Sequence, residues 1–137
     1  MNNNTPMSLM DFVRVAKTRI REVTPEQLQE MFDSQDDVLL VDVRESSEHE
    51  QGHIKGAMLV PRGILEAAAD PTYPKHQIEL SAARQRPVVL YCATGGRSAM
   101  AADTLQLMGF SNVCSLDGGF VRWAQENRPV IKEARYI

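Results

Sequence analysis

Short apolar runs alternate with helical patterns through most of the chain. The apolar runs predict strands at residues 38–43, 57–60, 88–92 and 113–116. The helical patterns lie at residues 64–69, 78–85, 98–108 and 120–126. Three of the four runs are almost continuously apolar, which is typical of strands that are buried on both faces of a parallel sheet. The alternation therefore predicts an α/β domain with three layers.

The N-terminal residues predict an amphipathic helix ahead of this pattern. One apolar stripe recurs there at helical spacing: Leu9, Phe12, Val13, Ala16 and Ile20. The stripe can pack on the chain's own domain or serve for docking or dimerisation, and both interpretations stay open. Thr24 and Pro25 predict the start of a second helix, which Thr24 can cap. We expect an N-terminal helical extension at 1–21, one domain at 22–130 and a C-terminal tail at 131–137.

Composition narrows the class of protein without naming a function. The chain has 137 residues, which suits one domain, and its net charge of −3 argues against nucleic acid as a partner. No apolar run approaches the roughly 20 residues of a membrane span, and no secretory signal is recognisable. Two cysteines are too few for a disulfide framework, so we expect a cytoplasmic protein. Monomer and homodimer both stay open.

The most informative segment begins with Cys92, at the end of a predicted buried strand, and continues through Gly95, Gly96 and Arg97 into a helical pattern. Such a strand delivers the thiol to the carboxyl edge of the sheet, where open α/β folds bind ligands. The two glycines allow the chain to curl and to aim backbone N–H groups inward. The helix start and the Arg97 charge add positive potential, which favours the nucleophilic thiolate. A buried structural cysteine beside a simple turn is the alternative.

Four segments, in order, resemble the rhodanese family in its single-domain form. The first two are 40–45 (LVDVRE), similar to the family's D-x-R-E strand end, and 52–57 (GHIKGA), preceded by Glu48 and followed by Pro61. The third is 92–98 (CATGGRS), which resembles the active-site loop. The fourth is 116–120 (LDGGF) with Trp123, which resembles the closing L-x-G-G-x-x-x-W motif. The resemblance covers about residues 22–130.

The resemblance implies a three-layer rhodanese-like domain, a five-stranded parallel sheet with helices on both faces, and an edge strand near 22–23. It also implies sulfur transfer: Cys92 takes the outer sulfur of a donor such as thiosulfate, becomes a persulfide, and passes the sulfur to a thiol or cyanide. The residues that follow would bind the donor and the persulfide: Ala93, Thr94, Gly95, Gly96, Arg97 and Ser98. No metal and no diffusible cofactor is needed.

This interpretation has two structural requirements. Amides rather than carbonyls must face the thiol, and the thiol must stay open to solvent. Loop length argues against a cysteine phosphatase or an arsenate reductase. The phosphatases use C-x5-R, which leaves room for a phosphoryl group, whereas Cys92 and Arg97 form the tighter C-x4-R.

Four residues outside the loop are candidates for roles near it. Arg62 lies in a long segment that should border the site, and it is either a substrate contact or an ion-pair partner. Asp42 and Arg44 are expected to support the strand end structurally. Cys114 is either a resolving thiol or a partly buried strand residue.

The letters His49-Glu50-Gln51-Gly52-His53 spell H-E-x-x-H, the pattern of zinc metalloproteases. That chemistry needs both histidines on one continuous helix, and Gly52 is better placed to end a helix. We therefore expect no metal here.

A second class of function stays open beside the enzyme. A persulfide carrier or regulatory module would load sulfur and discharge it to a protein partner, with the N-terminal stripe as its docking surface. An enzyme would instead turn over small donors many times.

Overall fold

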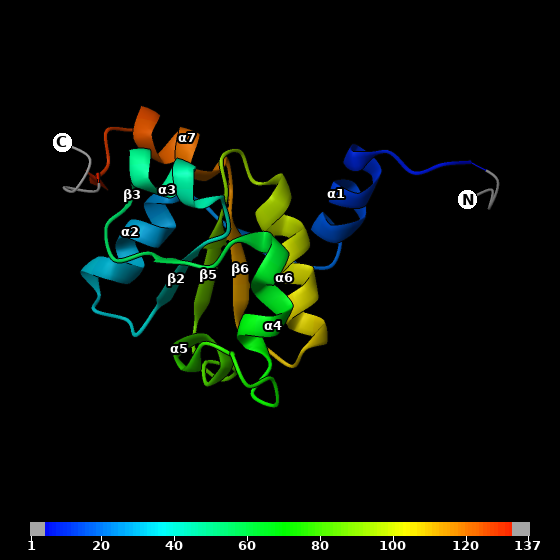
Figure 1. Cartoon of the computed structure of the whole chain (residues 1–137). Coiled ribbons are helices and arrows are strands. Elements are labelled where there is room, and N and C mark those ends of the chain that lie inside the picture. Colours follow the sequence, from blue (N-terminus) through cyan, green and yellow to red (C-terminus); the bar gives the residue numbers. More distant parts are fainter. Residues whose placement is uncertain (1–4, 133–137) are drawn as a thin grey trace.

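The computed structural model describes residues 5–132, and a five-stranded parallel sheet lies at its centre (Figure 1). The strands of this sheet are β1 (Arg21–Val23), β2 (Leu39–Asp42), β4 (Met58–Leu59), β5 (Val88–Tyr91) and β6 (Val113–Leu116). Their order across the sheet is β1-β6-β5-β2-β4, and every neighbouring pair is parallel. The fold class predicted from the sequence is confirmed.

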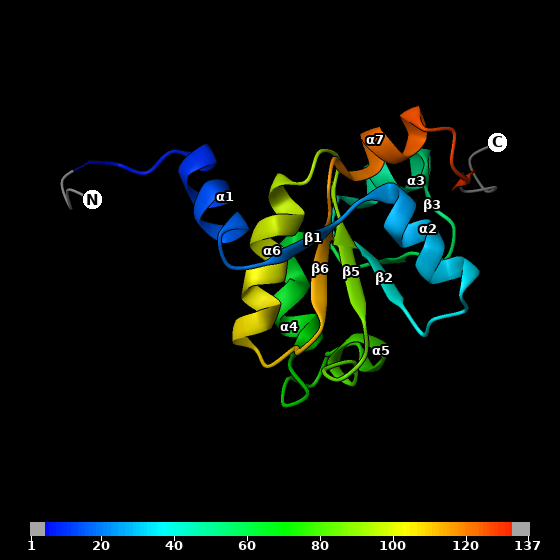
Figure 2. The ribbon, with the colours of Figure 1, turned by 180° about the vertical axis from the view of Figure 1, so that it is seen from behind.

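Helices cover both faces of the sheet, as Figure 2 shows from behind. They are α1 (Leu9–Lys17), α2 (Pro25–Asp33), α3 (Ser46–Gln51), α4 (Leu65–Ala69), α5 (Ile78–Ser81), α6 (Gly96–Leu107) and α7 (Gly119–Gln125), with the 3-10 turn η1 (Arg62–Ile64) before α4. On one face Leu105 of α6 packs in a cluster with Leu90 of β5. On the other face Leu28 and Trp123 pack in a cluster with Val89. Because successive strand residues point to opposite faces, β5 contributes to both clusters.

The helix starts follow their sequence signals. The Thr24 hydroxyl accepts a hydrogen bond from the Gln27 N–H, and the Gln27 side chain accepts one from the Thr24 N–H. Pro25 occupies the first helical position, where its missing N–H costs no bond. This capping box fixes α2 directly after edge strand β1, as the sequence predicts.

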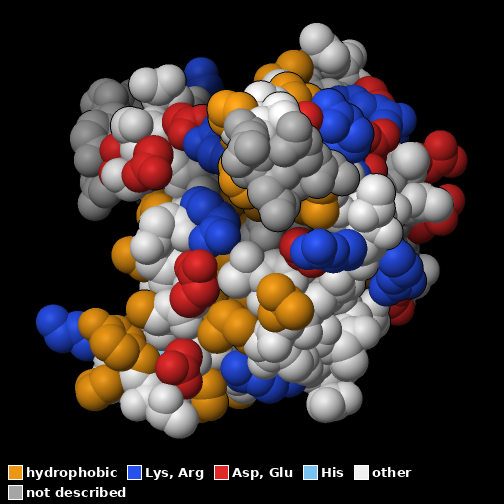
Figure 3. Space-filling model, turned by 90° about the vertical axis from the view of Figure 1, so that its right-hand side faces the viewer, with side chains coloured by type: hydrophobic (Ala, Val, Ile, Leu, Met, Phe, Trp, Pro, Cys, Tyr) orange, Lys and Arg blue, Asp and Glu red, His pale blue; other side chains and the backbone are white. Residues whose placement is uncertain are grey.

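The predicted N-terminal stripe is divided between the core and the surface. Val13 and Ala16 are buried where α1 packs on α6, and a Cβ added to Gly96 would lie 3.4 Å from a Val13 methyl. Leu9 and Phe12 are 66% and 52% exposed. Figure 3 views the side of the molecule from which α1 projects, and hydrophobic side chains lie at its surface among charged ones. α1 therefore packs on its own chain while part of its apolar face stays at the surface.

The division of the chain into an extension, a domain and a tail stays a prediction. Residues 1–4 of the extension and residues 133–137 of the tail lie outside the described residues. Across residues 5–132, no helix is both long enough and apolar enough to cross a membrane.

The helix predicted for 78–85 is shorter in the structure and ends at Ser81. Pro87 disfavours helical backbone in the residue before it. The Arg84 guanidinium donates hydrogen bonds to the backbone carbonyls of Ala69, Ser81 and Met108. That side chain ties three segments together in the region where the helix was expected to continue.

Two strands of two residues each were not predicted. β3 (His53–Ile54) and β7 (Val130–Ile131) pair antiparallel outside the main sheet. Strands of this length carry too few positions for a hydrophobic period to appear in the sequence. They join the segment after α3 to the segment after α7, and both helices border the candidate site.

Candidate active site

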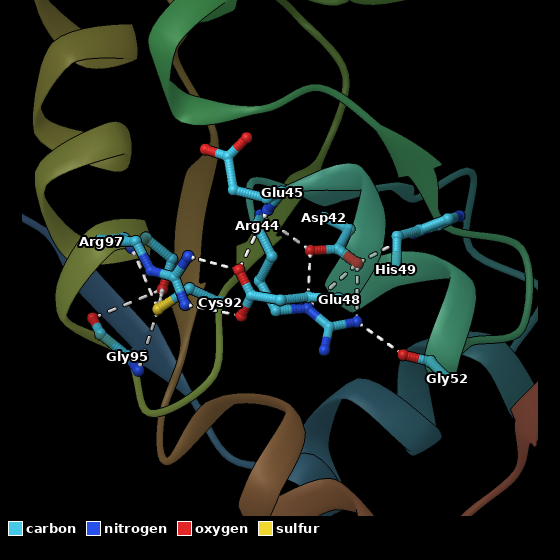
Figure 4. A network of polar contacts seen from close by, with 10 residues as sticks. Asp42, Arg44, Glu45, Glu48, His49, Gly52, Cys92, Gly95 and Arg97 are labelled. Atoms are coloured by element: carbon cyan, nitrogen blue, oxygen red, sulfur yellow. Dashed lines mark hydrogen bonds and ion pairs between the residues drawn. The ribbon is translucent and has the colours of Figure 1, made fainter.

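Cys92 lies directly after β5, at the carboxyl edge of the parallel sheet (Figure 4). Its Sγ accepts hydrogen bonds from the N–H groups of Gly95, at 3.1 Å, and Ser98, at 3.4 Å. Gly95 has a φ of +108°, a conformation that glycine adopts without a steric penalty, and α6 begins at the next residue. The positive end of the α6 dipole therefore also faces the sulfur. The first requirement, that amides face the thiol, is met.

The other predicted loop residues lie on either side of Gly95, two of them before it and two in the first turn of α6. They are Ala93, Thr94, Gly96 and Arg97. The contacts that their backbone amides would make to a bound sulfur or donor stay predictions.

The first carbonyls of the loop are engaged by α7 instead of facing the sulfur. The Phe120 N–H donates to the Cys92 carbonyl at 2.8 Å, and the Val121 N–H donates to the Ala93 carbonyl at 3.0 Å. Gly119 permits this close approach: its φ is +58°, and a Cβ there would lie 2.5 Å from the Cys92 carbonyl oxygen. Because these carbonyls are held by α7, the amides that follow can turn inward.

The thiol is closed to solvent, and the second requirement is therefore not met in this structure. Cys92 is 1% exposed and belongs to the apolar cluster beneath α6. The expectation of an open thiol was wrong because the curl that brings amides to the sulfur also wraps the loop around it. Attack on a donor needs a local opening.

Ser98 and Ser115 form a buried pair of hydroxyls beside the sulfur. The Ser98 Oγ lies 3.5 Å from the Cys92 Sγ and 2.8 Å from the Ser115 Oγ. Both serines are 0% exposed. Ser115 could not be predicted from the sequence, because one serine within an apolar strand gives no periodic or motif signal.

Arg97 and Glu48 form a two-point ion pair at the mouth of the loop. The two Nη atoms of Arg97 donate to the two carboxylate oxygens of Glu48 at 2.9 and 3.0 Å. The hydrogen bond from Arg97 lowers the pKa of Glu48 to about 2. Glu48 belongs to one of the four segments that resemble the family. Its pairing with Arg97, 49 residues later, could not be predicted from sequence spacing.

Asp42 and Arg44 form a buried ion pair behind the loop. The Arg44 Nη2 donates to Asp42 at 2.8 Å and to the Gly52 carbonyl at 2.7 Å, and the His49 Nδ1 donates to Asp42 at 2.9 Å. Burial opposes ionisation of Asp42, but the hydrogen bonds from Arg44 and His49 outweigh it and hold the pKa of Asp42 below its ordinary value. The structure thus places both residues at the end of β2, as predicted, and the supporting role stays a proposal.

Aromatic rings connect this buried pair to the segment that leads into Cys92. The Arg44 guanidinium lies 4.4 Å from the centre of the Phe120 ring and 5.4 Å from that of Tyr91. Tyr91 is the residue before Cys92, and its hydroxyl accepts a hydrogen bond from the Ile54 N–H at 3.1 Å. Burial raises the pKa of Tyr91, so its hydroxyl keeps its proton. The ends of β2 and β5 and the start of α7 are therefore fixed relative to one another.

Arg62 contacts groups away from the loop. It donates to Glu66 at 2.9 Å and to the Thr104 hydroxyl at 3.2 Å. Thr104 lies six residues beyond Ser98 on α6, which is about 9 Å farther along the helix axis. The structure therefore holds Arg62 in an ion pair, and a substrate contact by this residue stays a prediction.

Cys114 lies on the opposite side of the sheet from Cys92. Val113 belongs to the cluster beneath α6, so strand alternation directs Cys114 to the other face. Burial raises the pKa of the Cys114 thiol. The sheet separates the two sulfurs, which argues against a resolving thiol. That role of Cys114 stays an untested prediction.

The H-E-x-x-H letters do not lie on one helix. α3 ends at Gln51, and the second histidine, His53, lies on β3. The His53 Nδ1 donates to the His49 carbonyl at 2.9 Å, and the two rings stack with their centres 3.8 Å apart. Within residues 5–132, no group of three or more His, Cys, Asp and Glu side chains is arranged to hold a metal ion.

The fold and the site define an α/β protein with a cysteine whose sulfur accepts hydrogen bonds from the amides of a short loop. Residues 24–126 match the family model described as "Rhodanese-like domain", and the chain belongs to this family. The resemblance drawn from the four motifs is therefore confirmed.

Three curated relatives match over most of this chain. The "Probable adenylyltransferase/sulfurtransferase MoeZ" of Mycobacterium tuberculosis is 35% identical over 107 residues, which are 78% of this chain and 25% of that protein. This chain thus spans about a quarter of its length. A sulfurtransferase of Allochromatium vinosum is 32% identical over 82% of this chain and 95% of its own. YrkF of Bacillus subtilis, named as a candidate sulfur carrier protein, is 31% identical over 76% of this chain and 51% of its own.

One solved structure resembles nearly the whole chain. It is a protein of unknown function from Rhodopseudomonas palustris, described as a possible tyrosine phosphatase. The TM-score is 0.85 at 31% identity, over 96% of this chain and 99% of that one.

We predict that Gly119→Ala disrupts the loop. The new Cβ would overlap the Cys92 and Ala93 carbonyls, and the positive φ adds strain, so the free energy of unfolding should fall by about 2–4 kcal/mol. Chemical denaturation measures this. Gly63→Ala is the control, because a Cβ there meets nothing within 4 Å. Equal stability of the two variants would contradict the role of Gly119.

We also predict that Arg44→Met lowers the free energy of unfolding by about 3–5 kcal/mol, because it leaves the Asp42 carboxylate buried without its cation. Arg86→Met is the matched control. Arg86 pairs with Asp37, which is 83% exposed, and surface pairs contribute about 1 kcal/mol or less. Denaturant titration compares the two, and a loss no larger for Arg44 than for Arg86 would show that the buried pair does not support the site.

Proposed function

We propose that the protein is a sulfurtransferase that carries sulfur as a persulfide on Cys92. The observation that carries the proposal is the pair of backbone amides, from Gly95 and Ser98, that donate to the Cys92 sulfur. Such donors stabilise negative charge on the thiolate and on the outer sulfur of a persulfide. Membership of the rhodanese-like family and similarity to the Allochromatium vinosum sulfurtransferase support the same reaction class.

The proposed reaction is two displacements at sulfur. The Cys92 thiolate attacks the outer sulfur of thiosulfate, an S–S bond forms, and sulfite leaves with the electron pair of the broken S–S bond. A thiolate or cyanide then attacks the outer sulfur of the persulfide, and the electron pair of that bond returns to Cys92 as a thiolate. These steps use no metal and no diffusible cofactor, and a reducing cytoplasm would keep the free thiol available.

A phosphatase is the alternative suggested by the description of the Rhodopseudomonas palustris protein. The loop of this chain runs from Cys92 to Arg97 as C-x4-R. It has one residue fewer than the C-x5-R loop that surrounds a phosphoryl group, which favours a single sulfur as the bound atom.

We predict that incubation with thiosulfate adds about 32 Da, the mass of one sulfur, and that a reductant removes it. Cys92→Ser should abolish the gain, because the nucleophile is lost. Cys114→Ser should retain it, because Cys114 faces the other side of the sheet. Intact-mass spectrometry measures all three proteins. Sulfur on Cys92→Ser, or hydrolysis of p-nitrophenyl phosphate by a protein that takes up no sulfur, would contradict the proposal.

A sulfur carrier is a second candidate, favoured by the surface of α1. Met10 is 61% exposed beside the exposed Leu9 and Phe12, and one relative is named as a candidate carrier. The two candidates differ in kinetics. With thiosulfate and cyanide in excess, an enzyme forms many thiocyanate ions per chain, whereas a carrier forms about one and waits for its partner.

A further inference from the structure

Arg97 is the cation of the loop that would bind a donor, and its guanidinium is already paired with the Glu48 carboxylate. We propose that Glu48 is a specificity-determining residue: its carboxylate holds the Arg97 site and closes the loop, and an anionic sulfur donor must displace it. The inference rests on the proposed function and names the class of donor, a small oxyanion that can accept two hydrogen bonds from Arg97.

A small anionic donor can make the same two contacts that Glu48 makes to Arg97. Two oxygens of Glu48 accept from two nitrogens of Arg97 at 2.9 and 3.0 Å. The sulfonate end of thiosulfate also presents several oxygens on one centre, so it can accept the same pair of hydrogen bonds. Glu48 thus occupies the position that a two-point anion would take.

The pair also lies where the thiol is closed. Cys92 is 1% exposed, and Figure 4 shows the Glu48 carboxylate turned toward Arg97, which belongs to the same loop as Cys92. The charge of Cys92 also acts on the Arg97 guanidinium. A donor that replaces Glu48 on Arg97 would therefore arrive next to the nucleophile.

The two arginine–carboxylate pairs of the site differ in how readily they can open. The Arg44 and Asp42 side chains are 5% and 0% exposed, so separating them would leave charges buried. The Arg97 and Glu48 side chains are 37% and 34% exposed, so water can replace each partner. Because the pKa of Glu48 is about 2, the carboxylate stays charged near neutral pH, and the pair opens by exchange of anions.

The structure offers the displaced carboxylate a place to go. An open cleft of about 340 Å³ adjoins the site, lined by Arg44, Glu48, Gln51, Gly52 and Phe120. The charge of Arg44 reaches Glu48 and helps to lower its pKa. Glu48 can therefore turn into this cleft and keep a cation nearby.

Glu48→Gln is the decisive variant. The Glu48 carboxylate accepts a hydrogen bond from the Glu45 N–H at 3.1 Å, and the side-chain oxygen of glutamine can accept the same bond. The variant therefore preserves the helix start and removes the competing charge. We expect KM for thiosulfate to fall about two- to fivefold with kcat little changed, which is the range of a partly exposed ion pair. Glu45→Gln is the control, since Glu45 is exposed and Figure 4 shows its carboxylate turned away from Arg97. That variant should leave KM unchanged.

An alkylation assay separates this inference from the proposed function. The rate at which iodoacetate modifies Cys92, read by peptide mapping, should rise about two- to fivefold in Glu48→Gln, and the rate with neutral iodoacetamide should rise less. A higher KM or lower kcat in Glu48→Gln would show that Glu48 positions Arg97 and would overturn the inference, as would equal effects in Glu45→Gln. If the native protein transfers no sulfur, the proposed function fails, while the alkylation rates still decide the role of Glu48.

Discussion

The arrangement of the candidate site depends on backbone N–H groups that point at one sulfur atom, the Cys92 Sγ. Strand β5 delivers Cys92 to the sheet edge, and the amides of Gly95 and Ser98 meet its Sγ. A loop this short can present amides inward only if its first carbonyls are bonded elsewhere. The first N–H groups of α7 donate hydrogen bonds to these carbonyls, and Gly119 leaves room for the close approach. The two glycine-containing segments, far apart in the sequence, therefore form one structural unit.

Around this unit the site uses two arginines in opposite ways. Arg44 is buried with Asp42 at the end of β2, and its guanidinium lies over the Phe120 ring of α7. Arg97 lies at the surface end of the loop and pairs with Glu48, where water and ligands can compete. In the proposed reaction, one ion pair would support the shape of the site, and the other would offer an exchangeable anion position near Cys92.

Much of this arrangement was predictable from sequence. Continuous apolar runs marked the buried strands, Thr24 marked a helix start, and Cys92 with two glycines and an arginine marked the loop. Local patterns do not report which distant side chains meet, so the Glu48–Arg97 pair and Ser115 were missed. The closed thiol was also missed, because solvent exposure depends on how tightly the loop wraps. The early end of α5 was also missed: Pro87 disfavours helical backbone before it, and Arg84 bonds to three carbonyls in the region where the helix was expected to continue.

A crystal structure of the protein after reaction with thiosulfate tests the central claim most directly. The account predicts an additional sulfur bonded to the Cys92 Sγ and lying within hydrogen-bonding distance of backbone N–H groups of the loop from Ala93 to Ser98. An unmodified Cys92, or an added sulfur that faces backbone carbonyls, would contradict it.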